Sequence, residues 1–433
     1  MTLSTRLGAG LLLAAALGAA PALAQTPYGE DSTFRGLGGK AGIQAIVATL
    51  IPLATADVRI KEQFVDTDLQ QLAERLAEQL CEFSGGPCKY TGKYKDRDMA
   101  SAHVDLKISN AQFNALTEDL QLAMAAHGVA NAVQNKLIAK LAPMQRDIVT
   151  VPAGAGAPAQ GRPDMGKFLA TGGVSQLEGA GGGGLSPWAL ISGYGSADSW
   201  GANAHYTRVG TQDYTLASYG VAVGIADRLE LSLARQDFRG SLAPLDRLRI
   251  EQDIVGLKLR VAGDAVYAQD RLLPQIAVGV QYKRNKGVGG LGALGVSSVK
   301  QLGAKDDHGY DYYVAASKIL FEQSLLLNAT VRATRANQMG LLGFGGDRGD
   351  SLRLMPELSA AYLLDRKLAL GVEYRRKPHN LGVDKEKAYA DVFLAWFPSK
   401  QFSATVAYAE LGDITIFNPT KQRGLYLSLQ AGF

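Results

Sequence analysis

Apolar residues recur along this chain at two different spacings, and the change between them divides the chain into two halves. From about residue 34 to residue 150 an apolar residue returns every three or four positions, which predicts amphipathic helices. From about residue 163 onward apolar residues alternate with polar or small ones, which predicts strands. The intervening run PAGAGAPAQGRPDMG (152–166) breaks both periods with Pro, Gly and Ala, and is typical of a linker.

The first half predicts a compact all-α unit. One of its helices is expected to begin at Thr67 or Asp68 and to end at Gly85 and Gly86, because glycine commonly ends helices. A unit of roughly 115 residues buries about two-thirds of its unfolded surface, which is enough for a core. The apolar stripes are Ile43, Ile46, Val47, Leu50 and Ile51; Leu69, Leu72, Leu76, Leu80 and Phe83; Phe113, Leu116, Leu120 and Met124; and Val133, Leu137, Leu141 and Met144.

The second half repeats its alternation in many short runs, such as VGLKLRV (255–261), IAVGVQYK (276–283) and GLYLSLQAGF (424–433). Strands of this kind form either the half-buried sheet of a soluble protein or the wall of a membrane barrel. Runs of about 9–14 residues match the length that a tilted strand needs to cross a bilayer, which favours the barrel.

The connections between these strands also favour a barrel, with about 12–14 antiparallel strands. Short hairpins at 225–231 and 363–370 alternate with longer polar stretches at 284–309, 338–351 and 376–387, as in outer-membrane barrels. The final strand closes on Phe433 and resembles the terminal signal read by the outer-membrane assembly machinery. Aromatic residues expected to form interfacial girdles at strand ends are Tyr219, Tyr282, Tyr374, Trp396, Phe397 and Tyr408. The predicted fold class is therefore α plus all-β, in two domains.

The N-terminus predicts export from the cytoplasm. Arg6 precedes the apolar run LGAGLLLAAALGAA, and ALA at 22–24 supplies the small residues of a cleavage site after Ala24. No other run reaches the ~20 apolar residues of a membrane helix. The expected divisions are a signal peptide (1–24), a helical domain (30–150), a linker (151–165) and an outer-membrane barrel (166–433).

Composition narrows the possible chemistry. Lys and Arg together number 45 against 41 Asp and Glu, so no surface for nucleic acid is predicted. The chain holds only 2 Cys and 5 His, which leaves few metal or thiol sites. Cys81 and Cys88 bracket a turn and are candidates for a disulfide in an oxidising compartment. Side chains expected to line the barrel lumen are Lys258, Arg260, Lys283, Arg375, Glu230 and Glu373.

The glycine run GAGGGG (179–184) does not lie between a strand and a helix of a βαβ unit. A nucleotide-binding loop is therefore not predicted there.

The helical half resembles a group I truncated haemoglobin over about residues 34–150. The resemblance is carried, in order, by GLGGKAGIQAIV (36–47), GGPCKYTG (85–92), DMASAHVDLKIS (98–109) and LAPMQRDIV (141–149). It implies a 2-on-2 helical fold that binds haem b, with His103 as the proximal iron ligand. On spacing alone, a lone histidine of a helix such as His103 is more often a surface or satisfied core residue than a ligand. The resemblance also implies haem contacts from Phe64, Thr67, Leu72, Leu76, Ile51, Tyr90 and Met99.

The chain departs from this family on the side of the haem where gas binds. Ile51 stands where the family commonly has a hydrogen-bonding tyrosine, and Leu72 and Leu76 stand where polar groups are common. An apolar ligand side disfavours stable oxygen carriage and penalises NO or CO less. The residues KYKDR (93–97) are an insertion before the helix that carries His103.

The strand-rich half resembles a proteobacterial outer-membrane family to which no activity is attached. The matching stretches include TGGVSQLEGAGGGGLSPWALISGYG (171–195), GLLGFGGDRGD (340–350) and GLYLSLQAGF. This resemblance supports a location in the outer membrane but does not indicate a substrate.

Together these features predict a periplasmic haem domain anchored by a barrel in outer-membrane lipid. The domain would bind a diatomic gas (O₂, NO or CO) or carry out haem redox chemistry, without a defined turnover reaction. A second hypothesis makes the barrel a channel or transporter, with the helical domain as a plug or as a handler of solute or haem. A third keeps the helical fold without haem.

Overall fold

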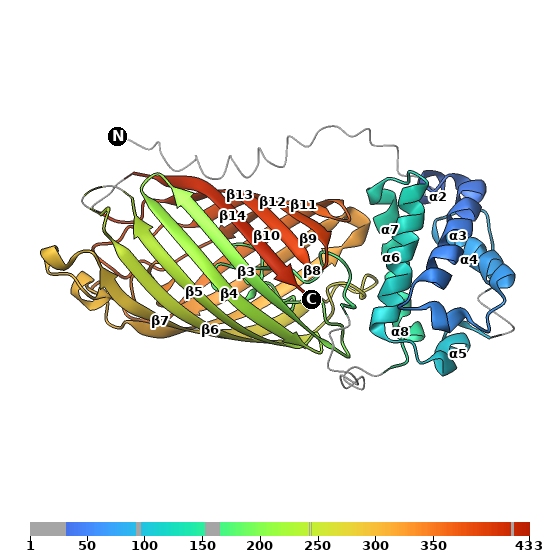
Figure 1. The fold of residues 1–433 in the computed structure, drawn as a ribbon, viewed down its shortest axis with the longest axis horizontal. Helices are drawn as coiled ribbons and strands as arrows, with labels where there is room; N and C mark the ends of the chain where they lie inside the picture. Colours follow the sequence, from blue (N-terminus) through green and yellow to red (C-terminus); the bar gives the residue numbers. More distant parts are fainter. Residues whose placement is uncertain (1–31, 92–96, 152–164, 242, 244, 417–419) are drawn as a thin grey trace.

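A computed structural model describes residues 32–91, 97–151, 165–241, 243, 245–416 and 420–433 of the protein. Figure 1 shows a helical domain packed against one end of a β-barrel. The predicted signal peptide (1–24) lies outside the described residues, as do most of the linker and of the 93–97 insertion. The fold class predicted from the sequence, a helical domain followed by an antiparallel barrel, is confirmed.

Local capping sequences set the helix boundaries. Asp68 caps α4 by accepting a hydrogen bond from the Gln71 backbone N–H, and Ser109 and Gln112 form a capping box at the start of α6. The predicted helix from Thr67 or Asp68 to Gly85 is therefore α4. The helices are α2 (Ser32–Gly36), α3 (Gly39–Ala56), α4 (Leu69–Phe83), α5 (Met99–His103), α6 (Asn110–Ala126), α7 (Asn131–Leu141) and α8 (Gln145–Ile148), with 3₁₀ turns η1 (Lys61–Phe64), η2 (Val104–Leu106) and η3 (Ala142–Met144).

The core of the helical domain forms where α3 packs against α4 and α6. Among the described residues, α3 is the one helix long and apolar enough to cross a membrane. Its apolar face is instead buried in the domain core, which is how the core helix of a globular domain behaves. The buried core residues are Leu37, Ile43, Ile46, Val47, Leu50, Leu80, Cys81, Leu120, Ala123, Met124, Val129 and Leu137.

The second half closes into a barrel of 12 antiparallel strands, within the predicted range. Every strand pairs with its neighbours in sequence, and β14 pairs with β3 to close the wall. The strands are β3 (Trp200–Thr211), β4 (Tyr214–Ile225), β5 (Leu229–Gly240), β6 (Arg249–Ala262), β7 (Gln275–Gly289), β8 (His308–Leu320), β9 (Leu325–Thr334), β10 (Arg353–Asp365), β11 (Leu368–Arg375), β12 (Tyr389–Ser399), β13 (Phe402–Gly412) and β14 (Gln422–Gly432).

The two ends of the barrel differ. One end, named here the short-turn end, carries the start of β3, the end of β14 and the connections 226–228, 263–274, 321–324, 366–367 and 400–401. The other, the long-loop end, carries the connections 212–213, 241–248, 290–307, 335–352, 376–388 and 413–421. The asymmetry follows the predicted alternation of short hairpins and long loops.

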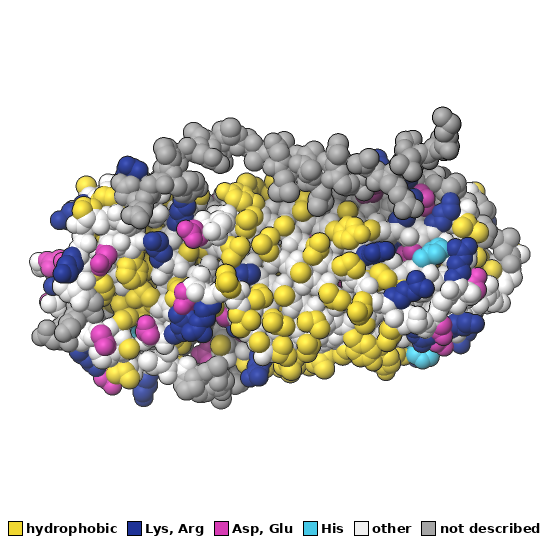
Figure 2. Space-filling view, turned by 180° about the vertical axis from the view of Figure 1, so that it is seen from behind, with side chains coloured by type: hydrophobic (Ala, Val, Ile, Leu, Met, Phe, Trp, Pro, Cys, Tyr) yellow, Lys and Arg dark blue, Asp and Glu magenta, His cyan; other side chains and the backbone are white. Residues whose placement is uncertain are grey.

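The outside of the barrel carries an apolar belt next to the short-turn end. Figure 2 shows apolar side chains gathered over the middle of the molecule, with charged side chains toward both ends. Along β5, for example, outward Leu231 and Leu233 give way to outward Arg235. Exposed apolar residues of the belt include Val221, Leu231, Leu233, Val255, Leu257, Leu259, Val278, Val314, Leu327, Val331, Leu370, Val392, Leu394, Val406, Leu427 and Leu429.

The aromatic girdle differs from its prediction. Tyr219 and Tyr408 face outward but lie in mid-strand. Beyond them the outward positions continue with Ala217 and Thr215 on β4 and with Glu410 on β13. Trp396 is 49% exposed, whereas Phe397 is 5% exposed and points inward. Placing Phe397 in the girdle was therefore wrong, since successive side chains of a strand face opposite sides.

The barrel lumen is filled by the chain's own residues 166–199, named here the plug. Nearly all of its residues from 172 to 196 are buried, and it contains the two-stranded sheet of β1 (Val174–Ser175) and β2 (Gly181–Gly182). The sequence hypothesis that the helical domain plugs the barrel is thus corrected. That domain lies outside the lumen, and the segment after the linker fills it.

Helices α6 and α7 join the helical domain to the short-turn end. Asn135 of α7 donates to the Ser324 hydroxyl at 3.0 Å, and Asn131 donates to the Leu363 carbonyl oxygen at 3.1 Å. Arg146 pairs with Asp270 of the β6–β7 connection at 2.7 Å. The two domains therefore share a polar interface at this end of the barrel.

Candidate functional site

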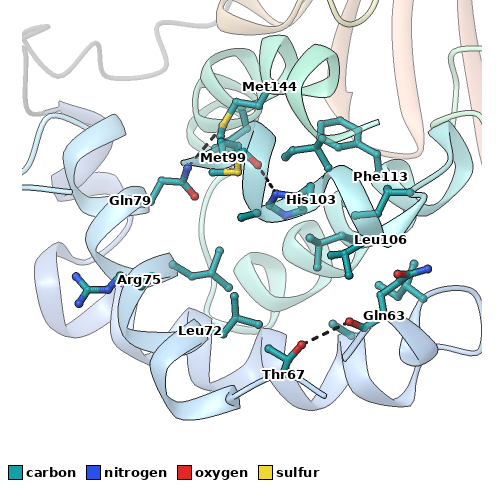
Figure 3. A pocket seen from close by; sticks show the side chains of 18 of the residues that line it. Gln63, Thr67, Leu72, Arg75, Gln79, Met99, His103, Leu106, Phe113 and Met144 are labelled. Carbon is teal, nitrogen blue, oxygen red and sulfur yellow. Dashed lines mark hydrogen bonds between the residues drawn. The ribbon is translucent and has the colours of Figure 1, made fainter. Parts of the chain in front are cut away.

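A cavity of about 240 Å³ opens between α3, α4, α5 and α6 of the helical domain. In the same measure a single water needs about 10–15 Å³, so the space suits a much larger group. Its lining is mostly apolar, and Figure 3 shows Leu72 of α4 and His103 of α5 on different sides of it. Every residue expected from the sequence at the site lines this cavity: Ile51, Phe64, Thr67, Leu72, Leu76, Tyr90, Met99 and His103.

His103 is held by its own short helix. Asp98 caps α5 by accepting a hydrogen bond from the Ser101 backbone N–H at 2.8 Å. One turn later, His103 Nδ1 lies 2.7 Å from the carbonyl oxygen of Met99. A carbonyl oxygen only accepts, so Nδ1 carries the hydrogen and the Nε2 lone pair is left for a metal. This is the usual arrangement of a histidine that ligates a metal.

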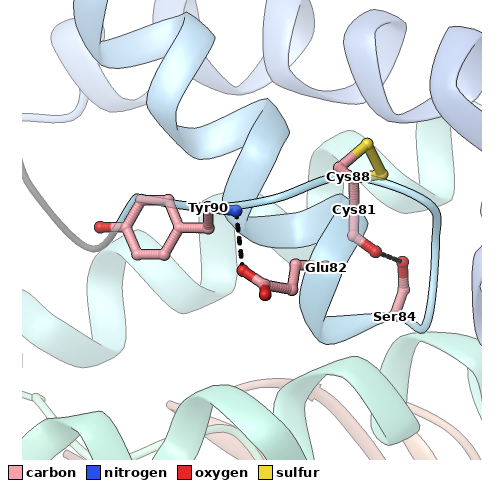
Figure 4. Close-up of a disulfide and its surroundings, with 5 residues drawn as sticks. All are labelled: Cys81, Glu82, Ser84, Cys88 and Tyr90. Carbon is pink, nitrogen blue, oxygen red and sulfur yellow. Dashed lines mark hydrogen bonds between the residues drawn. A yellow bond between two sulfur atoms is a disulfide. The ribbon is translucent and has the colours of Figure 1, made fainter.

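The turn after α4 carries the chain from this helix toward α5. The Gly86 backbone N–H donates to the Cys81 carbonyl oxygen at 2.8 Å, and a Cβ at Gly86 would lie 2.4 Å from the Phe34 ring. Cys81 and Cys88 are joined by a disulfide with a Cα–Cα distance of 5.7 Å. Figure 4 shows this bond beside the hydrogen bond from the Tyr90 backbone N–H to the Glu82 carboxylate.

The wall opposite His103 is apolar where it was expected to be. Ile51 of α3 and Leu72 and Leu76 of α4 carry no hydrogen-bond donor. Polar groups that were not predicted from the sequence occur elsewhere in the lining. Gln63 lines the cavity, and buried Gln79 points its amide at the Met144 sulfur, 3.6 Å away.

Two guanidinium groups also line the cavity and were not predicted. Arg75 pairs with Glu78 at 2.7 Å, and Arg97 pairs with Asp105 at 3.2 Å. Guanidinium groups are strong partners for carboxylates. The position of Arg75, between Leu72 and Leu76 on the helix that covers the cavity, is the sequence signal that could have identified it. Arg97 belongs to the insertion, where residue matching to the family fails.

The cavity lining also includes the phenol of Tyr90. The Tyr90 phenol keeps its O–H as a donor at physiological pH, and burial raises its pKa further above the ordinary value of 10. His127, by contrast, lies outside the cavity, with Nε2 2.8 Å from the Thr49 hydroxyl. Of the two histidines in the helical domain, His103 is therefore the one placed for cavity chemistry.

These features fit a haem better than a metal ion held by side chains alone. No group of three or more His, Cys, Asp or Glu that could hold a metal occurs in the described part of the chain. A haem brings its own four nitrogen ligands and needs one imidazole, an apolar slot and partners for its carboxylates. His103, the apolar walls, and Arg75 with Arg97 supply these three requirements.

Comparisons with known proteins agree with the division into two domains. Residues 171–430 match the model of the family described as "Protein of unknown function (DUF3034)", and residues 32–150 match that of "Bacterial-like globin". A group 1 truncated hemoglobin of Tetrahymena thermophila is 31% identical over 104 residues, covering 24% of this chain and 83% of that protein.

Solved structures similar to each half are also found. The crystal structure of truncated hemoglobin from Tetrahymena pyriformis, Fe(III) form, has 28% identity and a TM-score of 0.26, covering 27% of this chain and 97% of that chain. The structure of the KdgM porin has 10% identity and a TM-score of 0.34, covering 53% of this chain and 99% of that chain.

Proposed function

Because this chain belongs to the group 1 truncated haemoglobins over its helical domain and to the DUF3034 family over its barrel, we propose that it is a haem-binding globin anchored in the outer membrane. Its expected role is to bind a diatomic gas or to carry out haem redox chemistry on the periplasmic side. The observation that carries this proposal is the His103 imidazole, with Nε2 free, beside an apolar cavity of about 240 Å³.

Each lining residue then has a definite task. His103 would bind the iron of haem b through Nε2, while the Met99 carbonyl oxygen holds the imidazole ring through Nδ1. Arg75 and Arg97 would supply guanidinium partners for the haem carboxylates, and Tyr90 would supply a further hydrogen-bond donor. The cavity walls that would enclose the haem and exclude water include Phe64, Thr67, Met99, Leu72, Leu76 and Ile51.

When bound, haem supplies an iron that takes up a diatomic gas. The chain's own contribution is the environment on the gas-binding side. Ile51, Leu72 and Leu76 cannot donate a hydrogen bond, so a gas that becomes polarised gains no stabilisation from them. We therefore expect O₂ to be held weakly, and NO or CO to be disfavoured less.

The barrel is the anchor in this proposal. Its outward apolar belt has the character of a lipid-facing surface, and its strands of 8–15 residues are long enough to cross a bilayer at a tilt. In outer-membrane barrels the short turns and both termini face the periplasm. The helical domain docks at the short-turn end, so it would lie in the periplasm, where the predicted signal peptide would deliver it.

A second candidate function, transport through the barrel, is favoured by one observation. The lumen wall is lined by polar and charged side chains, as in water-filled barrels. They include Lys258, Lys283, Arg375, Glu230 and Glu373, as the sequence predicted, while Arg260 lies nearer the rim with its side chain 20% exposed.

The haem proposal is tested by titrating the purified full-length protein with haemin and recording its absorption spectrum. Wild type is expected to bind one haem and to show a Soret band, and His103→Ala is expected to lose that band. His127→Ala is the matched control, because His127 lies outside the cavity. A folded wild-type protein without a Soret band, or a band unchanged in His103→Ala, would contradict the proposal.

A further inference from the structure

The plug is bound inside the barrel by charge pairs that the sequence gave no reason to expect. Glu178 of the plug has no solvent exposure and is contacted by three cations of the wall. Arg375 donates to its carboxylate at 2.8 Å, Arg332 lies 3.4 Å away, and Lys283 forms the closest contact. These cations come from β11, β9 and β7, so one plug carboxylate ties together three strands of the wall.

Wall carboxylates in turn bind the glycine run of the plug. Glu230 accepts hydrogen bonds from the backbone N–H groups of Gly181 at 2.9 Å and Ser192 at 2.8 Å. Glu373 accepts from the Leu185 N–H at 2.8 Å. A Cβ at Gly183 would lie 2.1 Å from Glu373 Oε1. The run GAGGGG therefore allows the plug backbone to approach carboxylates of the barrel wall.

The side chains that the barrel wall points into the lumen are mostly polar, so they would interact well with water. If the lumen served only as a packed core, apolar side chains would suffice. Replacing buried ion pairs by apolar groups is often neutral or stabilising. Here the inward positions are polar on most strands, so the wall would remain hydrated if the plug left. They include Thr207, Ser218, Gln236, Gln252, Lys258, Gln281, Lys283, Arg332, Glu357, Ser359, Glu373, Arg375, Thr405, Ser428 and Gln430.

Helix α6 and Lys400 contact the chain where the plug begins, at Met165 and Gly166. The buried side chain of Asn114 donates to the Gly166 carbonyl oxygen at 2.7 Å, and Lys400 pairs with Glu118 and donates to the Met165 carbonyl oxygen, both at 2.8 Å. The residues Asn110, Asn114 and Glu118 follow one face of α6 at four-residue spacing, toward the barrel.

The other face of the same helix lines the cavity of the helical domain. Phe113 is part of the cavity lining, and its ring packs edge-on against Tyr267 of the barrel at 6.2 Å between centroids. The Tyr267 hydroxyl donates to Asn110 at 2.7 Å and also contacts Asn114. One helix thus touches the cavity, the barrel and the start of the plug.

We propose that the barrel is a channel that residues 166–199 hold closed, and that α6 latches the plug in place through Asn114. The inference rests on the proposed membrane location of the barrel and does not require haem. It assigns the polar lumen a function, passage of small hydrophilic solutes, that is suppressed until the plug is displaced. It also gives the helical domain a physical means of controlling that passage.

The test is the conductance of full-length protein in planar lipid bilayers. Wild type is expected to be closed for most of the recording. Asn114→Leu loses the buried hydrogen bond to Gly166 and is expected to raise the open probability about tenfold. Gly183→Ala places a Cβ against the Glu373 carboxylate and is expected to raise the open probability by crowding the plug away from the wall. Gly210→Ala is the control for Gly183→Ala, because a Cβ at Gly210 meets nothing within 4 Å. Asn131→Leu controls for Asn114→Leu, because it breaks a domain contact without touching the plug.

A second readout follows the plug directly. Ser186 lies in the plug with no exposed surface, and both native cysteines are joined in the disulfide. Ser186→Cys should therefore react with a hydrophilic maleimide about tenfold faster when combined with Asn114→Leu than with Asn131→Leu.

Two results would overturn the inference: steady conductance of the wild type, or variants that insert into lipid yet stay as closed and unreactive as their controls. Failure of the protein to insert into liposomes at all would instead refute the proposed membrane location. That failure is recognised separately by flotation of the liposomes.

Discussion

In the proposed haem site, three side chains would set the preference among diatomic gases. Ile51, Leu72 and Leu76 project from α3 and α4 into the cavity, and none can donate a hydrogen bond. Thr67, a polar residue of the lining, donates its hydroxyl to the Gln63 carbonyl oxygen at 3.5 Å. Ligand preference at this site is therefore expected to respond strongly to a single added donor.

Ile51→Tyr supplies that donor. We expect the substitution to slow O₂ dissociation from the haem-loaded, reduced protein about tenfold, the effect of roughly one hydrogen bond. Ile51→Phe, which adds a ring without a hydroxyl, is expected to leave the rate within about twofold, since it adds no hydrogen bond. Stopped-flow measurement of O₂ release compares the variants. Equal rates for Tyr and Phe would show that position 51 does not face the bound gas.

Asp119 gives the helical domain a dependence on pH. This buried carboxyl lies near Asp57, Arg59 and Glu118, and burial, with repulsion from Asp57, raises its pKa from 3.8 to about 6. The folded state therefore holds the Asp119 proton more tightly than the unfolded state does, so protonation of this group favours folding. That stability is fully present below the unfolded pKa and is lost as the pH rises through about 6.

Asp119→Asn should consequently stabilise the domain above pH 6 by at most about 3 kcal/mol, and have little effect near pH 4. Thermal melts of the helical circular-dichroism signal at two pH values measure this, because the described α-helices all lie between residues 32 and 148. Asp66→Asn, at an exposed position, is the control. A gain of equal size at both pH values would contradict the assignment.

Among the elements, those with strong local signals were predicted well. The α4 helix begins after Asp68 and ends before Gly85 because a cap and a glycine mark its ends. The strands were recognisable because each alternates between lipid-facing and lumen-facing residues. The plug was not predicted, because its glycine-rich sequence has no period and its position depends on partners distant in sequence, such as Glu178 with Arg375.

Helix α6 also has partners distant in sequence that its own residues could not predict. Its residues Phe113 and Leu116 were predicted only as part of an apolar stripe, and the fold shows that both line the cavity. Its polar residues Asn110, Asn114 and Glu118 gave no sign of a partner, since a polar face of a helix ordinarily meets water. Only the fold shows that this face meets the barrel and the plug.

The disulfide is the element-scale feature most open to test. Removing it by replacing both Cys81 and Cys88 with serine should cost about 2–3 kcal/mol, the loop-closure contribution of a short loop. Urea unfolding of the helical signal in the full-length protein measures the loss. The same protein under reducing conditions should lose a similar amount, and a stability unaffected by either treatment would show that the bond does not constrain the turn.

At the scale of the whole molecule, the arrangement predicts opposite exposure of the two ends of the barrel. Gly292 lies in the β7–β8 connection of the long-loop end, and Glu62 lies in the helical domain with its side chain 77% exposed. In intact cells a membrane-impermeant maleimide should label Gly292→Cys, whereas Glu62→Cys should react only after the outer membrane is permeabilised. Labelling of Glu62→Cys in intact cells would reverse the proposed orientation.

The bond between His103 Nε2 and haem iron is the central claim, and resonance Raman spectroscopy of the reduced, haem-loaded full-length protein observes it directly. If His103 binds the iron, an iron–histidine stretching band is expected that shifts when histidine is labelled with ¹⁵N and disappears in His103→Ala, but not in His127→Ala. A band that persists in His103→Ala would assign the iron to another residue and contradict the account.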